Sequence, residues 1–299
     1  MAGSFTAVDL SRLPFPDAIE APDFETIFAE MLADLRARDS TFTALVESDP
    51  AYKVLEVAAY RETLLRQRVN EAVKAVSLAY AAGADLDQLA AGFDVQRLMI
   101  DAGDATAIPP VAPTYEDDDS LRRRVQLSFE GFSTAGPEGA YIFHALGADA
   151  DVLDASVDSP TPGAVHVAVL SRVGDGTASS DLQDAVEAKL TGDSVRPLTD
   201  EVTVLSATIL AYTIVATLKT FSGPDHEVVM ANAQASAEAY AARQKRLGRA
   251  ITLSAVYAAL HVEGVQNVTL TQPAAGITPD WDEAANCTAV TLTYGGVGA

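Results

Sequence analysis

The side chains best suited to bind metal or transfer protons are four histidines and one cysteine: His144, His166, His226, His261 and Cys287. No two of them have the spacing of paired zinc ligands. His144 and His261 fall near the C-terminal ends of predicted helices, where the helix dipole favours a polar or cationic group. His166 alternates with valines in a predicted strand, and a single cysteine excludes an internal disulfide. We therefore expect no catalytic, metal or cofactor site at these residues.

Three other stretches resemble chemical motifs only in part. The loop "SRVGDGTASSD" at 171–181 lacks the lysine of a phosphate-binding loop and the glycine spacing of a dinucleotide site. The acidic run "EDDD" at 116–119 is not followed by a calcium-binding loop and is typical of a helix start, so we expect a helix over about 119–130. Glu130 and Glu138 flank a glycine-rich bend and are the best candidates for the paired carboxylates of a cell-wall hydrolase. The sequence favours a protein that is not an enzyme.

The composition limits the possible partners. The 299 residues contain 42 acidic and 20 basic side chains, for a net charge of −22. Such a surface repels phosphate backbones and anionic lipid, so we expect neither nucleic acid nor a membrane as a partner. The chain begins without a secretory signal pattern, and charges interrupt each apolar stretch before it could span a bilayer. These features predict a protein that is made in a cytoplasm and stays soluble there.

The N-terminal third predicts an extended arm followed by helices. Residues 1–22 contain prolines and no periodicity, and a helix is expected at 23–38 with Asp23 as its N-cap. Asp49 followed by Pro50 is a strong start signal for a second helix. Its apolar pattern continues to Gly83, so we expect this helix over 50–81, about 48 Å long. We assign 23–99 to one helical domain.

The long helix has two apolar stripes with arginines near them. One stripe is Val54, Ala58, Leu65, Val69, Ala72, Val76 and Tyr80; the other is Val57, Tyr60, Leu64, Ala75 and Leu78. Two stripes imply packing partners on two sides. Arg61 and Arg68 are seven residues apart and share a face. They could form a solvated face with weak ion pairs, or could fix helix register in an intermolecular bundle together with Asn70; spacing alone leaves both readings open.

Beyond the helical domain the pattern changes to mixed helix and strand. Residues 100–118 are rich in Pro, Ala and Asp and are predicted to be a linker. Two small α+β modules are expected at 119–206 and 207–299. Each contains the order helix, strand, proline-containing turn, strand, which suggests a related plan. The predicted fold class is therefore α+β, with an N-terminal helical segment including one long helix, followed by two mixed modules.

Longer stretches of the sequence resemble a known family. The runs "AYRETLLRQRVNEA", "AYAAGADLDQLA", "DDSLRRRVQLSFEGFSTAGPEGAYIFHALGAD" and "VLDASVDSPTPGAVHVAVLSRVGDGTAS" are similar to the baseplate J-like proteins of contractile-tailed bacteriophages and phage-tail-like bacteriocins. The similarity covers roughly residues 10–270. The resemblance implies a structural protein of the baseplate wedge, with no catalytic residues to transfer onto this chain.

The resemblance also implies partners and a location. Such proteins associate with other copies of themselves, with a smaller neighbouring baseplate tail protein and with the sheath and hub proteins, in a six-fold ring around the hub and spike. Assembly would take place in the bacterial host cytoplasm, and the protein would end in the baseplate of the virion or tail-like particle. The long helix would join an intermolecular bundle through aliphatic side chains that supply burial and polar ones that select the pairing. These interface residues are Leu64, Leu65, Val69, Val73 and Val76, with Arg61, Arg66, Arg68 and Asn70.

Two other functions are weighed against this one. A receptor- or glycan-binding tail module would need exposed aromatic platforms, yet aromatic residues are only 7% of the chain and there is one tryptophan. A cell-wall hydrolase would depend on Glu130 and Glu138. Binding to whole cells and clearing of cell-wall suspensions would detect these two activities.

Overall fold

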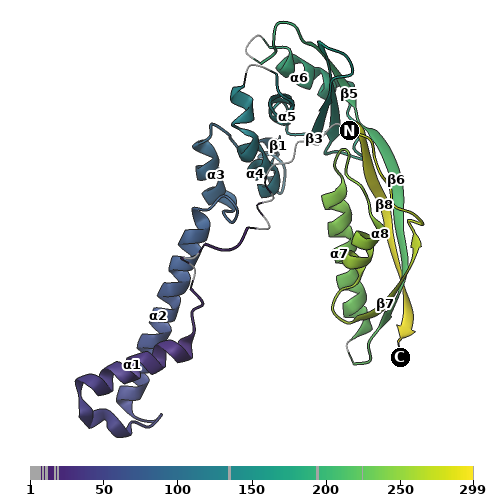
Figure 1. Ribbon diagram of the computed structural model, residues 1–299. Coiled ribbons are helices and arrows are strands. Elements are labelled where there is room, and N and C mark those ends of the chain that lie inside the picture. Colours follow the sequence, from purple (N-terminus) through teal and green to yellow (C-terminus); the bar gives the residue numbers. More distant parts are fainter. Residues whose placement is uncertain are drawn as a thin grey trace. The chain divides into compact units, whose positions relative to one another are not determined.

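The computed structural model describes residues 8, 10, 13–16, 18, 20–133, 136–192, 195–223 and 225–298. Figure 1 shows the order of the elements along the chain. The chain divides into two compact units, a helical unit over Val8–Gln96 and an α+β unit from Arg97 onward. A helical unit together with a unit of mixed helices and sheets confirms the predicted α+β fold class. Among the described helices, none combines the length and the apolar content that a bilayer-spanning segment requires.

The helices of the helical unit that the structure describes include α1 (Phe24–Arg38), the short 3₁₀ helix η2 (Ser40–Ala44), α2 (Pro50–Ala75) and α3 (Gly83–Ala91). The predicted caps are confirmed, since the Asp23 carboxylate accepts from Glu25 N and the Asp49 carboxylate accepts from Ala51 N. α1 packs on α2 through a small core of Ile27, Phe28 and Ala59, with Phe24, Met31, Leu32, Tyr52 and Leu55 around it. One side of α2 is therefore covered by the chain itself.

The long helix is shorter than the sequence predicts. α2 ends at Ala75 rather than at residue 81, which makes it about 39 Å long. Residues beyond Ala75 turn instead, because Ser77 N bonds to Lys74 O while the Ser77 hydroxyl bonds to Val73 O. A serine hydroxyl that competes for a backbone carbonyl in this way weakens the continuing helix.

The α+β unit begins with a small hairpin where a linker was predicted. Strands β1 (Met99–Asp101) and β2 (Thr114–Tyr115) pair antiparallel, and Asp104 bridges Val111 between them. α4 (Asp118–Leu127) follows, with the Asp117 carboxylate accepting from Ser120 N at its start. The expected helix at 119–130 is confirmed apart from its last turn, where a short 3₁₀ segment, η3 (Glu130–Phe132), replaces it.

A three-stranded sheet forms the first half of this unit. Its elements are α5 (Glu138–Leu146), β3 (Val152–Asp158), β4 (Ala164–Ser171), α6 (Ser180–Leu190) and β5 (Glu201–Ser206). β4 lies in the centre, antiparallel to β3 and parallel to β5. Residues from α5, α6 and the three strands share one buried core that includes Tyr141, Val167 and Val186.

A second three-stranded sheet forms the other half. Its elements are β6 (Thr208–Thr220), α7 (His226–Gln244), α8 (Leu253–Leu260), β7 (Val265–Gln272) and β8 (Glu283–Val297). β6 lies in the centre, antiparallel to β7 and parallel to β8. α7 and α8 pack against one face of this sheet, around a core that includes Ile214, Ala237 and Val256.

The two halves of the α+β unit differ more than their shared order of predicted elements suggests. The helix–strand–turn–strand order is present in both, as α5–β3–β4 and α8–β7–β8. However, β3 pairs directly with β4, whereas β6 lies between β7 and β8. The order of elements in the sequence could not reveal this difference in strand pairing, because pairing depends on contacts between residues that are far apart in the chain. The halves join through a small core of Leu170, Ala207 and Ala284.

Candidate protein interface

The candidate functional site is an exposed apolar face on α2. Six large apolar side chains of this helix are exposed, and Val76 at its C-terminal cap is a seventh. Their exposed fractions are Val54 69%, Val57 62%, Tyr60 56%, Leu64 39%, Leu65 67%, Val69 57% and Val76 72%. A run of this size on one helix is unusual for a surface that faces only water, and it marks a protein-interaction site.

Arg61 and Arg68 lie in the middle of this face. At 100° per residue they differ by about 20° around the helix axis, and the two predicted apolar stripes lie to either side of them. Arg61 is exposed and has no hydrogen bond or ion pair within the described part of the chain. Arg68 is 81% exposed, and its Nη1 lies 3.8 Å from Glu71 Oε2. The face therefore consists of two apolar stripes separated by a short row of positive charge.

The opposite face of α2 holds the other two polar residues of the prediction. Asn70 is buried, its Nδ2 donates to Glu20 O over 2.6 Å, and its Oδ1 accepts from Glu20 N over 3.1 Å. Arg66 donates to Glu62, 2.6 Å away, and to the Glu20 carboxylate at 3.2 Å. Both residues bind the N-terminal arm of their own chain.

The structure thus separates the nine predicted interface residues into two groups. Six of them share the exposed face: Leu64, Leu65, Val69, Val76, Arg61 and Arg68. Arg66 and Asn70 face the arm, and the half-buried Val73 lies on the same side as these two. A role between chains stays a prediction for all nine residues, and the geometry favours the first six.

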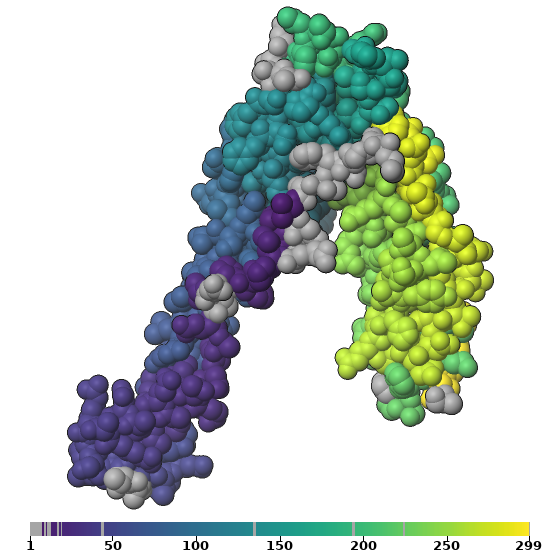
Figure 2. All heavy atoms as spheres, in the orientation of Figure 1, coloured from purple at the N-terminus to yellow at the C-terminus, as the bar shows by residue number. Residues whose placement is uncertain are grey.

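Sequence reasoning missed how the arm is held. The Tyr80 hydroxyl donates to Leu13 O over 2.6 Å, and the rings of Phe15 and Tyr80 stack with centroids 4.8 Å apart. Lys74 Nζ lies 4.6 Å from the centre of the Phe15 ring. Figure 2 shows the purple atoms of the arm running along the blue atoms of α2. The only sequence signal for this contact is the pair of aromatic residues, and nothing in their spacing links them.

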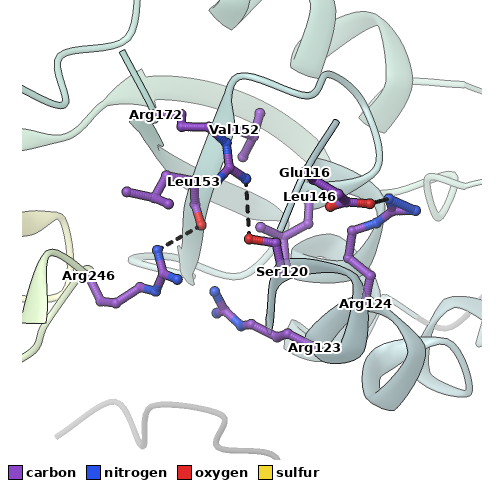
Figure 3. Close-up of a pocket in the computed structure, with 9 residues that line it drawn as sticks. All are labelled: Glu116, Ser120, Arg123, Arg124, Leu146, Val152, Leu153, Arg172 and Arg246. Carbon is purple, nitrogen blue, oxygen red and sulfur yellow. Dashed lines mark hydrogen bonds and ion pairs between the residues drawn. The ribbon is translucent and has the colours of Figure 1, made fainter. Parts of the chain in front are cut away.

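A second cluster of charges lies inside the α+β unit. Figure 3 shows its lining residues, which come from α4 and the segment just before it, the end of α5, β3, and the turns after β4 and α7: Glu116, Ser120, Arg123, Arg124, Leu146, Val152, Leu153, Arg172 and Arg246. The cavity has a volume of about 10 Å³, which is room for one water molecule and too little for a substrate. This cluster is suited to holding segments together rather than to binding a ligand.

Its contacts connect the two halves of the α+β unit. Arg123 Nη1 lies 2.7 Å from the buried Asp154 carboxylate, whose second oxygen accepts from Leu247 N at 3.0 Å. Arg246 donates to Leu153 O at 3.3 Å, and burial lowers the pKa of its guanidinium while Asp154 opposes that effect. A carboxylate of the first sheet thereby holds the turn that follows α7.

A neighbouring pair ties the start of the unit to α4. Arg124 Nη1 lies 2.7 Å from Glu116 Oε1, and both side chains are almost fully buried. The same carboxylate oxygen accepts from Leu98 N at 2.9 Å.

The remaining candidates from the sequence lie outside the charged cavity. The side chain of Glu130 packs against Gly139, the residue after Glu138, and both glutamates are half-buried. His144 lies in the last turn of α5 as expected, and burial lowers its pKa. Within the part of the chain that the structure describes, no three His, Cys, Asp or Glu residues gather in a way that could hold a metal ion.

Comparisons with known proteins match the chain along nearly its whole length. The Baseplate J-like N-terminal domain matches residues 47–104, the Baseplate J-like central domain 133–206, and the Baseplate J-like protein C-terminal domain 212–293. Baseplate protein J of Escherichia phage P2 is 47% identical over 296 residues, covering 97% of this chain and 98% of that protein. The exposed face of α2 lies within the first of these matches.

Proposed function

Because the chain belongs to the baseplate J-like family, we propose that it is a structural, non-enzymatic component of a contractile-tail baseplate. The near full-length similarity to a baseplate protein supports this assignment. In the proposed wedge, copies associate with each other, with a smaller neighbouring tail protein, and with sheath and hub proteins in a ring around the hub and spike. The protein assembles in the bacterial host cytoplasm and ends in the virion or tail-like particle.

The observation that carries the proposal is the exposed apolar face of α2. In a chain with a net charge of −22, this helix keeps Val54, Leu65 and Val69 more than half exposed. Burial of an aliphatic side chain is worth about 1.5–3 kcal/mol when complete, so covering several of them can offset the cost of association. The two stripes flanking the arginines offer contact to two neighbouring helices.

The remaining parts of the chain have separate roles in this proposal. The helical segment 23–99 enters the intermolecular bundle, and the modules at 119–206 and 207–299 make the contacts that join neighbouring wedges. The arm over 1–22 and the segment over 100–118, which contains most of the β1–β2 hairpin, connect and position these parts. The high acidity of the surface keeps the unassembled protein in solution despite its apolar helix face.

A substitution in the centre of the face tests the proposal. We expect Val69→Asp to prevent co-purification with co-expressed baseplate proteins, because a carboxylate would have to be buried against apolar side chains. Val228→Asp, at a helical valine of α7 with the same 57% exposure, shows whether a loss of co-purification is specific to α2. Assembly of Val69→Asp to the same extent as the wild type would contradict the use of α2 as an interface.

A further inference from the structure

Arg61 and Arg68 differ from the arginines that pair with carboxylates inside this acidic chain. Arg66, Arg97, Arg122, Arg123, Arg124 and Arg172 each have a carboxylate oxygen within 3.3 Å. Arg61 has no such neighbour in the described ranges, and Arg68 has one at 3.8 Å. What sets Arg61 and Arg68 apart is their place, since both lie in the middle of the exposed apolar face of α2 without a carboxylate oxygen within 3.3 Å among the described residues.

These two arginines will lose water when the apolar stripes are covered. Leu64 and Leu65 flank them, so a helix that buries either stripe must also pass close to the arginine row. A guanidinium moved out of water without a counter-charge is strongly unfavourable, whereas one that meets a carboxylate forms a charge-assisted hydrogen bond. The occupant of this face should therefore carry negative charge beside its own apolar stripe.

A second copy of α2 is poorly suited to supply the negative charge that Arg61 and Arg68 require. The members of both exposed stripes are apolar, and a copy aligned in parallel would bring Arg61 against Arg61. An antiparallel copy could offer Glu71, which lies at the border of the face and already contacts Arg68 and Gln67. Like charges in contact select against a partner, and opposite charges select for one.

We infer that the arginine row of α2 receives an acidic amphipathic helix from a different protein, with Asp or Glu at a seven-residue spacing beside an apolar stripe. Seven residues rise about 10.5 Å along a helix, which matches the separation of Arg61 and Arg68 on α2. This inference rests on the proposed function, because it names the chemistry of one partner of the same face. A copy of this chain that joins the bundle would then contact the apolar stripe that the acidic helix leaves free.

Synthetic helical peptides of the same length as α2 test the inference on the full chain. Two peptides share one Leu and Val stripe and differ only at two positions seven residues apart, which are Glu in one and Lys in the other. A third peptide has the sequence of residues 50–76 of this chain. Binding is measured by fluorescence anisotropy at low and high salt, with the wild-type chain, with Arg61→Glu/Arg68→Glu and with Val69→Asp.

We expect the Glu peptide to bind the wild-type chain about tenfold or more tightly than the Lys peptide, with the difference reduced by salt. Arg61→Glu/Arg68→Glu should reverse that order, and its circular dichroism should match the wild type because both positions are exposed. Equal binding of the Glu and Lys peptides, with Val69→Asp abolishing both, would overturn the acidic partner and leave the docking face intact. Tightest binding by the 50–76 peptide would instead identify a second copy as the occupant. Failure of all three peptides to bind would overturn the inference, and the co-purification of Val69→Asp then decides separately on the proposed function.

Discussion

The contact between Asp154 and Arg123 allows a quantitative prediction about how the α+β unit is held together. Asp154 lies on β3 with a side chain only 5% exposed. Its carboxylate pairs with Arg123 and accepts hydrogen bonds from Ala155 N and Leu247 N. Asp154→Asn keeps the size of the side chain but removes its charge. The positive charge of Arg123 then remains beside that of the largely buried Arg246 without the carboxylate that both of them face.

The expected loss of stability follows from burial. Removing one partner of a fully buried ion pair costs about 3–5 kcal/mol. Arg123 is 31% exposed, so water screens part of this loss, and the amide oxygen can still accept one backbone hydrogen bond. We therefore expect Asp154→Asn to lower the free energy of unfolding by about 2–3 kcal/mol. For a unit of this size that corresponds to a fall in Tm of about 5–10 °C.

Thermal unfolding combined with hydrogen exchange would measure both the size and the place of the effect. The matched control is Asp158→Asn, on the same strand, since no hydrogen bond or ion pair joins the Asp158 side chain to a described residue. Exchange should accelerate in the turn around Leu247, which Asp154 holds across the joint. Adding Arg123→Met to Asp154→Asn should recover part of the loss, because no unpaired charge then remains at that position.

The reasoning fails if Asp154→Asn lowers Tm no more than Asp158→Asn does. It also fails if the losses from Arg123→Met and Asp154→Asn simply add, because contacting partners in one network must show a coupling energy.

Two further predictions concern the arm and a buried tyrosine. Asn70→Ala removes both hydrogen bonds to Glu20, which costs about 1–3 kcal/mol. Amide exchange in the described residues of 13–22 should therefore accelerate by about tenfold or more. Gln67→Ala, at an exposed position of the same helix, should leave this exchange unchanged. Unchanged arm exchange in Asn70→Ala would contradict the anchoring role. Burial, and next the hydrogen bond to Asp200, raise the pKa of Tyr141. The neutral tyrosine therefore contributes its full stabilisation below the unfolded-state pKa of about 10, and this stabilisation is lost as the pH rises above that value. Denaturant unfolding between pH 8 and pH 11 (roughly the range around the unfolded pKa) should therefore show a steeper alkaline loss in the wild type than in Tyr141→Phe, and equal slopes would contradict this account.

The sequence predicted the starts of elements better than their ends. Asp23, Asp49 and Asp117 each precede a helix whose backbone N–H they accept, and a cap depends only on residues two or three positions away. The end of α2 was misplaced by six residues because no glycine or proline marks it. The decisive contact there is a serine hydroxyl bonded to a carbonyl of the preceding turn, which a periodic apolar pattern does not reveal.

The exposed face of α2 was predictable in its apolar residues and not in its polar ones. Helical spacing correctly grouped Leu65, Val69 and Val76 on one face, because the geometry of a helix fixes that grouping. Spacing could not show that Asn70 is occupied by Glu20, fifty positions earlier in the chain. The same limit applies to β7 and β8, whose separation by β6 depends on pairing between distant segments.

The most direct test of the structural role is negative-stain electron microscopy of particles from a strain that lacks this gene. A baseplate component should be needed for assembly, so we predict either no tails or sheath and tube material without baseplates. Restoring the gene should restore complete particles, and the Val69→Asp gene should not. Complete, normal-looking particles that fail only to attach or to kill would contradict the account and would point to receptor binding or cell-wall hydrolysis instead.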